Sequence, residues 1–237
     1  YDIPLRLVGS EMCIRDRQES VLKTVNGIRP EFIEATGKII EEAENVFQKI
    51  NHEMLLPLAD HIALAAKRAK ENRQLLNPFT PDIRVLFGEE YQVALKGREI
   101  IQQLTGYEIS EDEVGFITLH IHAGLSDEAV SQTLDATRIV NEGIAMIEQE
   151  FDQKLESGSL GCTRLMSHMY YMILRTRKGE GTNADFNDFI FQNYPRTGEA
   201  AKRVCDYMSR QLKQPVAKEE IGFLAIHIQR VISPDTV

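Results

Sequence analysis

The stretch Glu113-Val-Gly-Phe-Ile-Thr-Leu-His-Ile-His122 decides the organisation of this chain. It recurs 107 residues later as Glu220-Ile-Gly-Phe-Leu-Ala-Ile-His-Ile-Gln229. Glutamate, glycine, phenylalanine and histidine keep the same offsets in both copies. Such agreement within 237 residues indicates an internal repeat, and it is best explained by a tandem duplication.

The same offset relates other residues of the two halves, so the repeat is not confined to one stretch. Each half contains two histidines 59 residues apart, and four of the six histidines therefore occupy equivalent positions. We take these four as the candidate functional residues. The equivalent pairs are His61 with His168, His120 with His227, and Arg68 with Arg175.

The repeated stretch reads as a helix. Ser110-Glu-Asp-Glu113 has the pattern of a capping box, and apolar residues follow it at helical spacing. We therefore predict an all-α fold of two tandem homologous bundles with about five helices each. Helices are expected over about residues 30–50, 54–76, 89–104, 110–124, 127–155, 160–178, 186–194, 197–212 and 217–232, with a short piece of unassigned type around residues 83–87.

The length of the chain and the repeat together predict two domains of ordinary size, residues 18–126 and 127–237. Residues 1–17 match nothing in the repeat and have no helical period. Their segment 7–17 resembles translated sequencing adapter, so we interpret residues 1–17 as a non-native segment.

Composition excludes several classes of function. The net charge of −9 and the absence of a block of lysine and arginine argue against direct contact with nucleic acid. Cys13, Cys162 and Cys205 are odd in number and lack metal or disulfide spacing, which favours a reducing cytoplasm. No apolar run approaches the roughly 18 residues of a membrane-spanning helix.

Neither metal binding nor catalysis fits the histidines well. No histidine pair has the i,i+4 spacing of a helical chelate, so no metal is expected. Asp60 could orient its neighbour His61, but adjacent helical residues point about 100° apart, and Ser167 replaces Asp60 in the second copy. Without a nucleophile motif or a phosphate-binding glycine loop, we expect no enzyme activity and no cofactor.

Two interpretations of the four histidines remain. They could be hydrogen-bonded core residues, which is the default for a lone histidine. Alternatively, each could be a covalent switch, because neutral imidazole is nucleophilic near its ordinary pKa of about 6.5 and can accept a phosphoryl group. A phosphoryl group adds a charge approaching −2, which can bias a two-state assembly. Four equivalent positions favour the switch.

Several motifs resemble the duplicated regulation domains (PRDs) of the sugar phosphotransferase system, as found in BglG-type transcriptional antiterminators. The resemblance covers about residues 18–237. The motifs that carry it are Leu58-Ala-Asp-His-Ile, Asn77-Pro78, Gly115-Phe-Ile-Thr-Leu-His-Ile, Tyr194-Pro195 and Gly222-Phe-Leu-Ala-Ile-His-Ile.

The resemblance implies a cytoplasmic, non-catalytic sensor that is phosphorylated on histidine. His61 and His120 would be linked to inhibition through the sugar-specific enzyme II. His168 and His227 would be linked to activation by the phosphocarrier protein HPr. Phosphorylation would shift a homodimer between arrangements that help or hinder RNA binding. The RNA-binding domain itself is expected ahead of the first repeat and outside this chain.

Two alternatives stay open at this point. The chain could be the regulatory part of a PRD-containing transcriptional activator. The sequence that precedes Gln18 in the intact gene would decide between this alternative and an antiterminator. In a different class, it could be a helical metalloprotein or enzyme that uses His61 and His120.

The roles of the remaining candidate residues are also open. Arg68 and Arg175 lie about two turns after His61 and His168, where each could form a structural salt bridge or bind a phosphoryl group. His52 and His122 have no repeat partner, and we interpret them as ordinary surface or interface residues.

Overall fold

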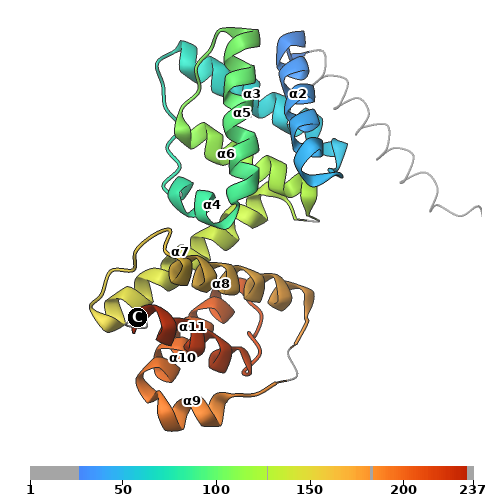
Figure 1. Cartoon of the computed structure of the whole chain (residues 1–237). Helices are drawn as coiled ribbons and strands as arrows, with labels where there is room; N and C mark the ends of the chain where they lie inside the picture. Colours follow the sequence, from blue (N-terminus) through green and yellow to red (C-terminus); the bar gives the residue numbers. More distant parts are fainter. Residues whose placement is uncertain (1–26, 127, 182–183, 234–237) are drawn as a thin grey trace, which may run out of the picture. The chain divides into compact units, whose positions relative to one another are not determined.

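The computed structural model describes residues 27–126, 128–181 and 184–233 (Figure 1). These residues form α-helices and one short 3-10 helix, with no strand among them, so the predicted all-α fold is confirmed. The predicted non-native segment, residues 1–17, lies outside the described residues. None of the helices described is long and apolar enough to cross a membrane.

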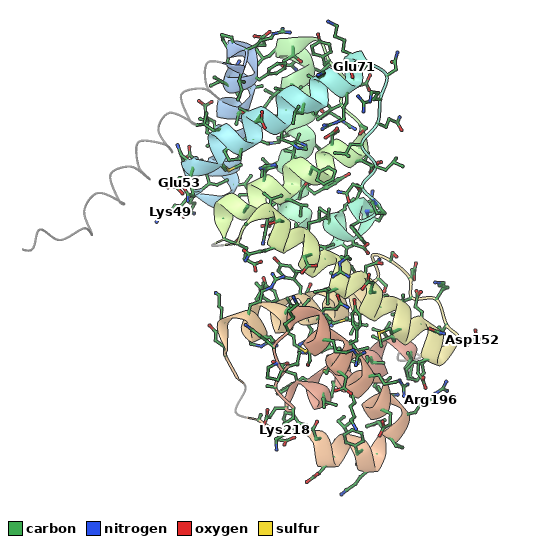
Figure 2. The ribbon with its side chains drawn as sticks, turned by 180° about the vertical axis from the view of Figure 1, so that it is seen from behind. Lys49, Glu53, Glu71, Asp152, Arg196 and Lys218 are labelled. Atoms are coloured by element: carbon green, nitrogen blue, oxygen red, sulfur yellow. The ribbon has the colours of Figure 1, made fainter. Side chains whose placement is uncertain are left out.

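The elements of the first half are separated by short connections, and the C-terminal end of α3 is the main departure from prediction. The sequence predicts this helix to about residue 76, but it ends at Lys70, because Asn72 adopts a left-handed φ of 51° and the Arg73 N–H donates to the Arg68 carbonyl. Glu53 and Glu71 are labelled near the two ends of α3 in Figure 2. The elements are α2 (Pro30–Phe47), η1 (His52–Met54), α3 (Leu55–Lys70), α4 (Thr80–Leu86), α5 (Gly88–Thr105) and α6 (Glu111–Leu125).

The second half repeats this order. At the end of α8, Gly179 takes the left-handed conformation at the position equivalent to Asn72, and the Glu180 N–H donates to the Arg175 carbonyl. The duplication therefore extends to the way the first histidine-bearing helix ends. The elements are α7 (Val130–Phe151), α8 (Leu160–Lys178), α9 (Asn187–Asn193), α10 (Pro195–Leu212) and α11 (Glu220–Ile232).

The chain divides into two compact units. The first takes the described residues up to Pro78 and those from Glu89 to 126, and the second takes Phe79–Gly88 and the described residues from Glu128 onward. Segment 79–88 was predicted within the first domain, yet it groups with the second unit. There Asp82 accepts a hydrogen bond from Asn141 and the buried Phe87 ring packs edge-on against Tyr170.

Equivalent apolar residues hold the two histidine-bearing helices together in each unit. α6 packs on α3 in the first unit and α11 packs on α8 in the second. Burying one large apolar side chain stabilises the fold by roughly 1.5–3 kcal/mol. The fully buried residues are Leu58, Ile62, Ile117 and Ile121 in the first unit and Leu165, Met169, Leu224 and Ile228 in the second.

A glycine of the repeated stretch allows close packing in the second unit. A Cβ added at Gly222 would lie 3.2 Å from the backbone carbonyl carbon of Phe186 and 3.2 Å from Asn187 Oδ1. A side chain here would displace the beginning of α9 by a few tenths of an ångström, so glycine favours the close approach of α11.

Candidate functional site

The two histidines of the first unit lie next to each other. His61 is on α3 and His120 is on α6, and their ring centroids are 5.2 Å apart with planes inclined by 44°. Both rings are partly exposed, because their neighbours Ile62 and Leu119 take the buried faces of the two helices. The packing of α3 on α6 thus joins residues 59 positions apart into one site.

The second unit builds the same pair from α8 and α11. The rings of His168 and His227 are stacked, with centroids 4.5 Å apart and planes inclined by 26°. Both are again partly exposed.

A buried glutamate and an arginine flank the first histidine of each pair. In the first unit Arg68 donates from Nε to Glu113 Oε1 at 2.6 Å and from Nη2 to Oε2 at 3.0 Å. In the second, Arg175 donates from the same atoms to Glu220 at 2.8 and 3.0 Å. Both glutamate side chains are only 4% exposed. Bidentate arginine–carboxylate pairs of this kind are among the stronger hydrogen-bonded contacts in proteins.

The same carboxylates face the histidine rings. His61 Nε2 lies 3.0 Å from Glu113 Oε2, and His168 Nε2 lies 3.6 Å from Glu220 Oε2. Neither contact is a hydrogen bond, and both Nε2 atoms are buried without a hydrogen-bond partner. A carboxylate that is itself bound to an arginine therefore lies beside each buried nitrogen.

Burial and neighbouring charges favour the neutral form of His120, His168 and His227. Burial, with a smaller contribution from His61, lowers the pKa of His120 to about 4. Burial, His227 and Arg175 together lower the pKa of His168 to about 4. The pKa of His227 is also lowered, by burial and then by Arg230 and Arg164. Neutral imidazole is the nucleophilic form.

The ionised form of the Glu113 carboxyl is favoured although its side chain is buried. Burial acts most strongly on this carboxyl and raises its pKa, but the contacts with His61 and Arg68 together outweigh burial. The net result is a Glu113 pKa below its ordinary value. The site therefore combines a buried negative charge with a neutral His120 ring.

Comparison with protein families identifies the repeat. The family model described as PRD domain matches twice, over residues 37–124 and 137–231. The chain belongs to the PRD domain family. The two histidine pairs fall one in each PRD, with both members of each pair inside the matched residues.

This PRD chain is similar to several known proteins, and the name of one of them states a role. The chain is 30% identical over 212 residues to the "GlcA/glcB genes antiterminator" of Staphylococcus carnosus (strain TM300), covering 89% of this chain and 70% of that protein. It is 26% identical to "Protein GlcT" of Staphylococcus saprophyticus subsp. saprophyticus, over 90% of this chain and 76% of that protein. A solved chain described as "Crystal structure of GlcT CAT-PRDI" is 31% identical, with a TM-score of 0.42, and the match covers 44% of this chain and 62% of that one.

The supporting residues predicted from sequence have different outcomes. Arg68 and Arg175 do form structural salt bridges, each with the glutamate of its own PRD. Asp60 is exposed, and the carboxylate that faces His61 comes from Glu113 instead. Asp60 is thus not the orienting carboxylate, because neighbours on α3 point in different directions.

Glu113 and Glu220 are the residues that sequence reasoning missed as part of the site. The signal was available, since glutamate occupies the same place in both copies of the repeated stretch. The capping-box interpretation assigned the Glu113 side chain to its own helix end. In the structure the Ser110 hydroxyl does accept from the Glu113 N–H, but the Glu113 carboxylate binds Arg68.

The second PRD has two further cations beside its histidines. Arg164 and Arg230 act on His227 through their charge, and Pro57 and Ala123 stand at the equivalent positions of the first PRD. The sequence offered no repeat signal for them, because they occur in one copy alone.

The two histidines without repeat partners pair with carboxylates away from the sites. His52 Nε2 lies 2.7 Å from Glu44 Oε1 at the surface, and His122 Nδ1 lies 3.0 Å from Glu90 Oε1 in a partly buried position. Gln229, which replaces His122 in the second PRD, accepts a hydrogen bond from Thr197, which replaces Glu90.

Other chemistry finds little support in the part of the chain that the structure describes. No three histidine, cysteine or acidic side chains within it gather as a metal site would require. Cys162 and Cys205 are buried free thiols, and burial raises the pKa of both, to about 12 for Cys205. A raised thiol pKa disfavours the reactive thiolate.

Proposed function

We propose that this chain is the regulatory part of a sugar-responsive transcriptional antiterminator, and that the phosphotransferase system phosphorylates it on histidine. Two PRDs and a relative named as an antiterminator support this proposal. No catalytic reaction and no cofactor are assigned to the chain itself. Its acidic charge and the buried free thiols fit a cytoplasmic regulator.

The observation that carries the proposal is the pairing of two partly exposed histidines in each PRD. A phosphoryl acceptor needs a nucleophilic nitrogen that a donor protein can reach. His120 and His168, with a pKa of about 4, keep an unprotonated nitrogen throughout the physiological range. The ring contacts, with centroids 5.2 and 4.5 Å apart, mean that a phosphoryl group on one histidine changes the surroundings of its partner.

The two PRDs receive opposite roles in this proposal. His61 and His120 are sites for inhibition through the sugar-specific enzyme II. His168 and His227 are sites for activation by HPr. Arg164 and Arg230, present in the second PRD alone, make its site the more favourable one for an anionic phosphoprotein donor.

Phosphorylation acts on assembly through charge. Each phosphoryl group adds about −1.5 to −2 charges at pH 7 and strong acceptor oxygens. At the site it competes with the buried carboxylate for Arg68 or Arg175. We propose that this change shifts a homodimer between two arrangements. RNA binding then belongs to a domain that precedes residue 18 in the intact protein.

Phosphate transfer in a defined mixture tests the proposal. The chain is incubated with phosphoenolpyruvate, enzyme I and HPr, with or without a matched enzyme II, and acid-labile phosphate is mapped by mass spectrometry. Single alanine variants at His61, His120, His168 and His227 identify the acceptors, and His52→Ala serves as the control histidine. We expect HPr alone to label His168 or His227. Absence of phosphate from all four, with enzyme II present, would refute the proposal.

A further inference from the structure

The two nitrogens of His61 and of His168 have different surroundings. Nε2 is buried in both rings, has no hydrogen-bond partner, and faces a glutamate oxygen at 3.0 or 3.6 Å. Nδ1 makes no hydrogen bond to the residues described, and it is not among the buried atoms that lack a partner. Solvent therefore reaches Nδ1, whereas Nε2 is closed off.

The buried carboxylate also decides which nitrogen carries the proton. A neutral imidazole has one N–H and one lone pair. A lone pair on Nε2 would point at an anionic oxygen in a poorly screened environment, whereas an N–H there is attracted to it. The proton belongs on Nε2, and the lone pair is left on Nδ1. Accessibility and tautomer thus select the same atom.

We propose that Nδ1 is the phosphoryl acceptor of His61 and His168, and that Glu113 and Glu220 are positioning residues that select this atom. The inference rests on the proposed function and deepens it, because it names the bond that forms. Glu113 and Glu220 are suited to this role because Arg68 and Arg175 hold each carboxylate with two hydrogen bonds.

The transfer from a phosphohistidine donor balances as follows. The Nδ1 lone pair attacks the donor's phosphorus, an N–P bond forms at Nδ1, and the donor's own P–N bond breaks. The donor ring keeps that electron pair and its other N–H, and it leaves as neutral imidazole. The acceptor ring keeps its proton on Nε2 and becomes positively charged. The carboxylate beside Nε2 stabilises this charge, as the carboxylate of a Ser-His-Asp triad stabilises its imidazolium.

His120 and His227 provide an internal contrast. Neither ring has a buried nitrogen without a partner, and neither forms an ion pair with a carboxylate among the residues described. The geometry therefore selects no nitrogen in these two rings. Any preference for one phosphorylated atom should be a property of His61 and His168.

The first test is the tautomer in the unmodified chain, which requires no substitution. In protein labelled with 15N-histidine at neutral pH, long-range proton–nitrogen NMR spectra distinguish the Nε2–H from the Nδ1–H form. Peaks are assigned with His61→Gln and His168→Gln. We expect both histidines to be Nε2–H tautomers. The Nδ1–H form at either position would overturn the inference there.

The second test identifies the phosphorylated atom. The intact chain is treated with potassium phosphoramidate, which needs no carrier protein, and separately with phosphoenolpyruvate, enzyme I and HPr. Phosphorus–nitrogen correlation spectra then read the isomer at each histidine. We expect phosphate on Nδ1 of His61 and His168 in the folded chain, and loss of this preference in urea. Phosphate on Nε2 of the folded chain overturns the inference.

Replacing the carboxylate tests its positioning role. Glu220→Gln keeps the shape of the side chain, but its amide can donate to Nε2 and favour the opposite tautomer. We expect HPr-dependent labelling of His168 to slow roughly 10-fold or more, as for other orienting partners, and the preference for Nδ1 to disappear. Labelling of His61 by phosphoramidate in the same molecule is the matched control, because this reaction needs neither HPr nor enzyme II. A purely structural glutamate would leave the isomer ratio unchanged.

The outcomes separate the two proposals. Nδ1 labelling by phosphoramidate without labelling by HPr and enzyme II would contradict the proposed function and leave the atom assignment standing. Labelling of Nε2 by HPr would support the proposed function and contradict the assignment of Nδ1.

Discussion

The sites of the first and second PRD share one framework, which is the histidine pair with its glutamate and arginine. They differ in the charged residues beside it, which we call the rim: Arg164 and Arg230 of the second PRD. Both sites have a histidine pair, a carboxylate that is 4% exposed, and an arginine bound to it through two hydrogen bonds. The rings are closer and more nearly parallel in the second site, and the histidine–glutamate distance is shorter in the first. The proposed phosphorylation relies on this shared part of the two sites.

The rim separates the two sites by charge. The second PRD has Arg164 and Arg230 where the first has Pro57 and Ala123. Away from the sites, the His122–Glu90 contact of the first PRD corresponds to the Gln229–Thr197 hydrogen bond of the second. We infer that partner preference depends on the rim, because the framework is nearly the same in both.

The largest expected effect comes from breaking the framework. Arg68→Leu or Arg175→Leu leaves a buried carboxylate without its arginine, and each change should cost about 3 kcal/mol in the free energy of unfolding of its own unit. Urea denaturation followed by circular dichroism measures this. Arg73→Leu removes a surface pair with Glu71 and should cost less than about 0.5 kcal/mol. If Arg68→Leu and Arg175→Leu cost as little free energy of unfolding as Arg73→Leu, the two buried pairs would not stabilise the sites as proposed.

The next largest effect is a loss of stability at mildly acidic pH. The folded-state pKa of His120 and of His168 is about 4, below the ordinary value of 6.5, so the unfolded chain binds more protons between these values. Stability is therefore complete above pH 6.5 and falls as the pH drops toward 4. Each histidine should cost about 1–2 kcal/mol at pH 5 relative to pH 7.

Urea denaturation at the two pH values measures this effect. His120→Gln should flatten the pH dependence of the first unit and His168→Gln that of the second. Equal wild-type stability at pH 5 and pH 7 would show that the two buried rings are not held neutral.

A smaller effect should distinguish the rims. Arg164→Ala and Arg230→Ala should each slow the transfer from phosphorylated HPr to the second PRD by about 3- to 10-fold at low salt, through loss of electrostatic attraction. Transfer rates at low and high salt measure the effect, which should shrink as salt rises. Arg164→Lys, which keeps the charge, is the matched control. Unchanged rates in both alanine variants would place partner preference elsewhere.

The smallest expected effect concerns His122 and Glu90, which in the first PRD occupy the positions equivalent to Gln229 and Thr197. His122→Gln and Glu90→Thr should each destabilise the first unit, whereas the double change recreates the neutral pair of the second. A double-mutant cycle should give a coupling energy of about 0.5–1 kcal/mol. Additive losses would mean that the two side chains act independently.

Helix positions were largely predictable, because the spacing of apolar residues is a local property. α8 was predicted with its observed bounds, Leu160–Lys178. Errors fall at helix ends, where a left-handed residue stops a sequence that could continue as helix. Asp152, with a φ of 50°, ends α7 at Phe151, although the pattern predicted the helix to continue to about residue 155.

The sequence by itself determined the repeat, the all-α fold and the four candidate histidines, because duplication preserves residue types at equal offsets. Only the tertiary structure decided which atoms meet. The Arg68–Glu113 and Arg175–Glu220 pairs each join residues 45 positions apart on different helices. A local pattern cannot predict them, since the Glu113 carboxylate could equally cap its own helix. Packing of α6 on α3 and of α11 on α8 makes the distant arginine the partner, because an ionised carboxylate buried there requires a cation.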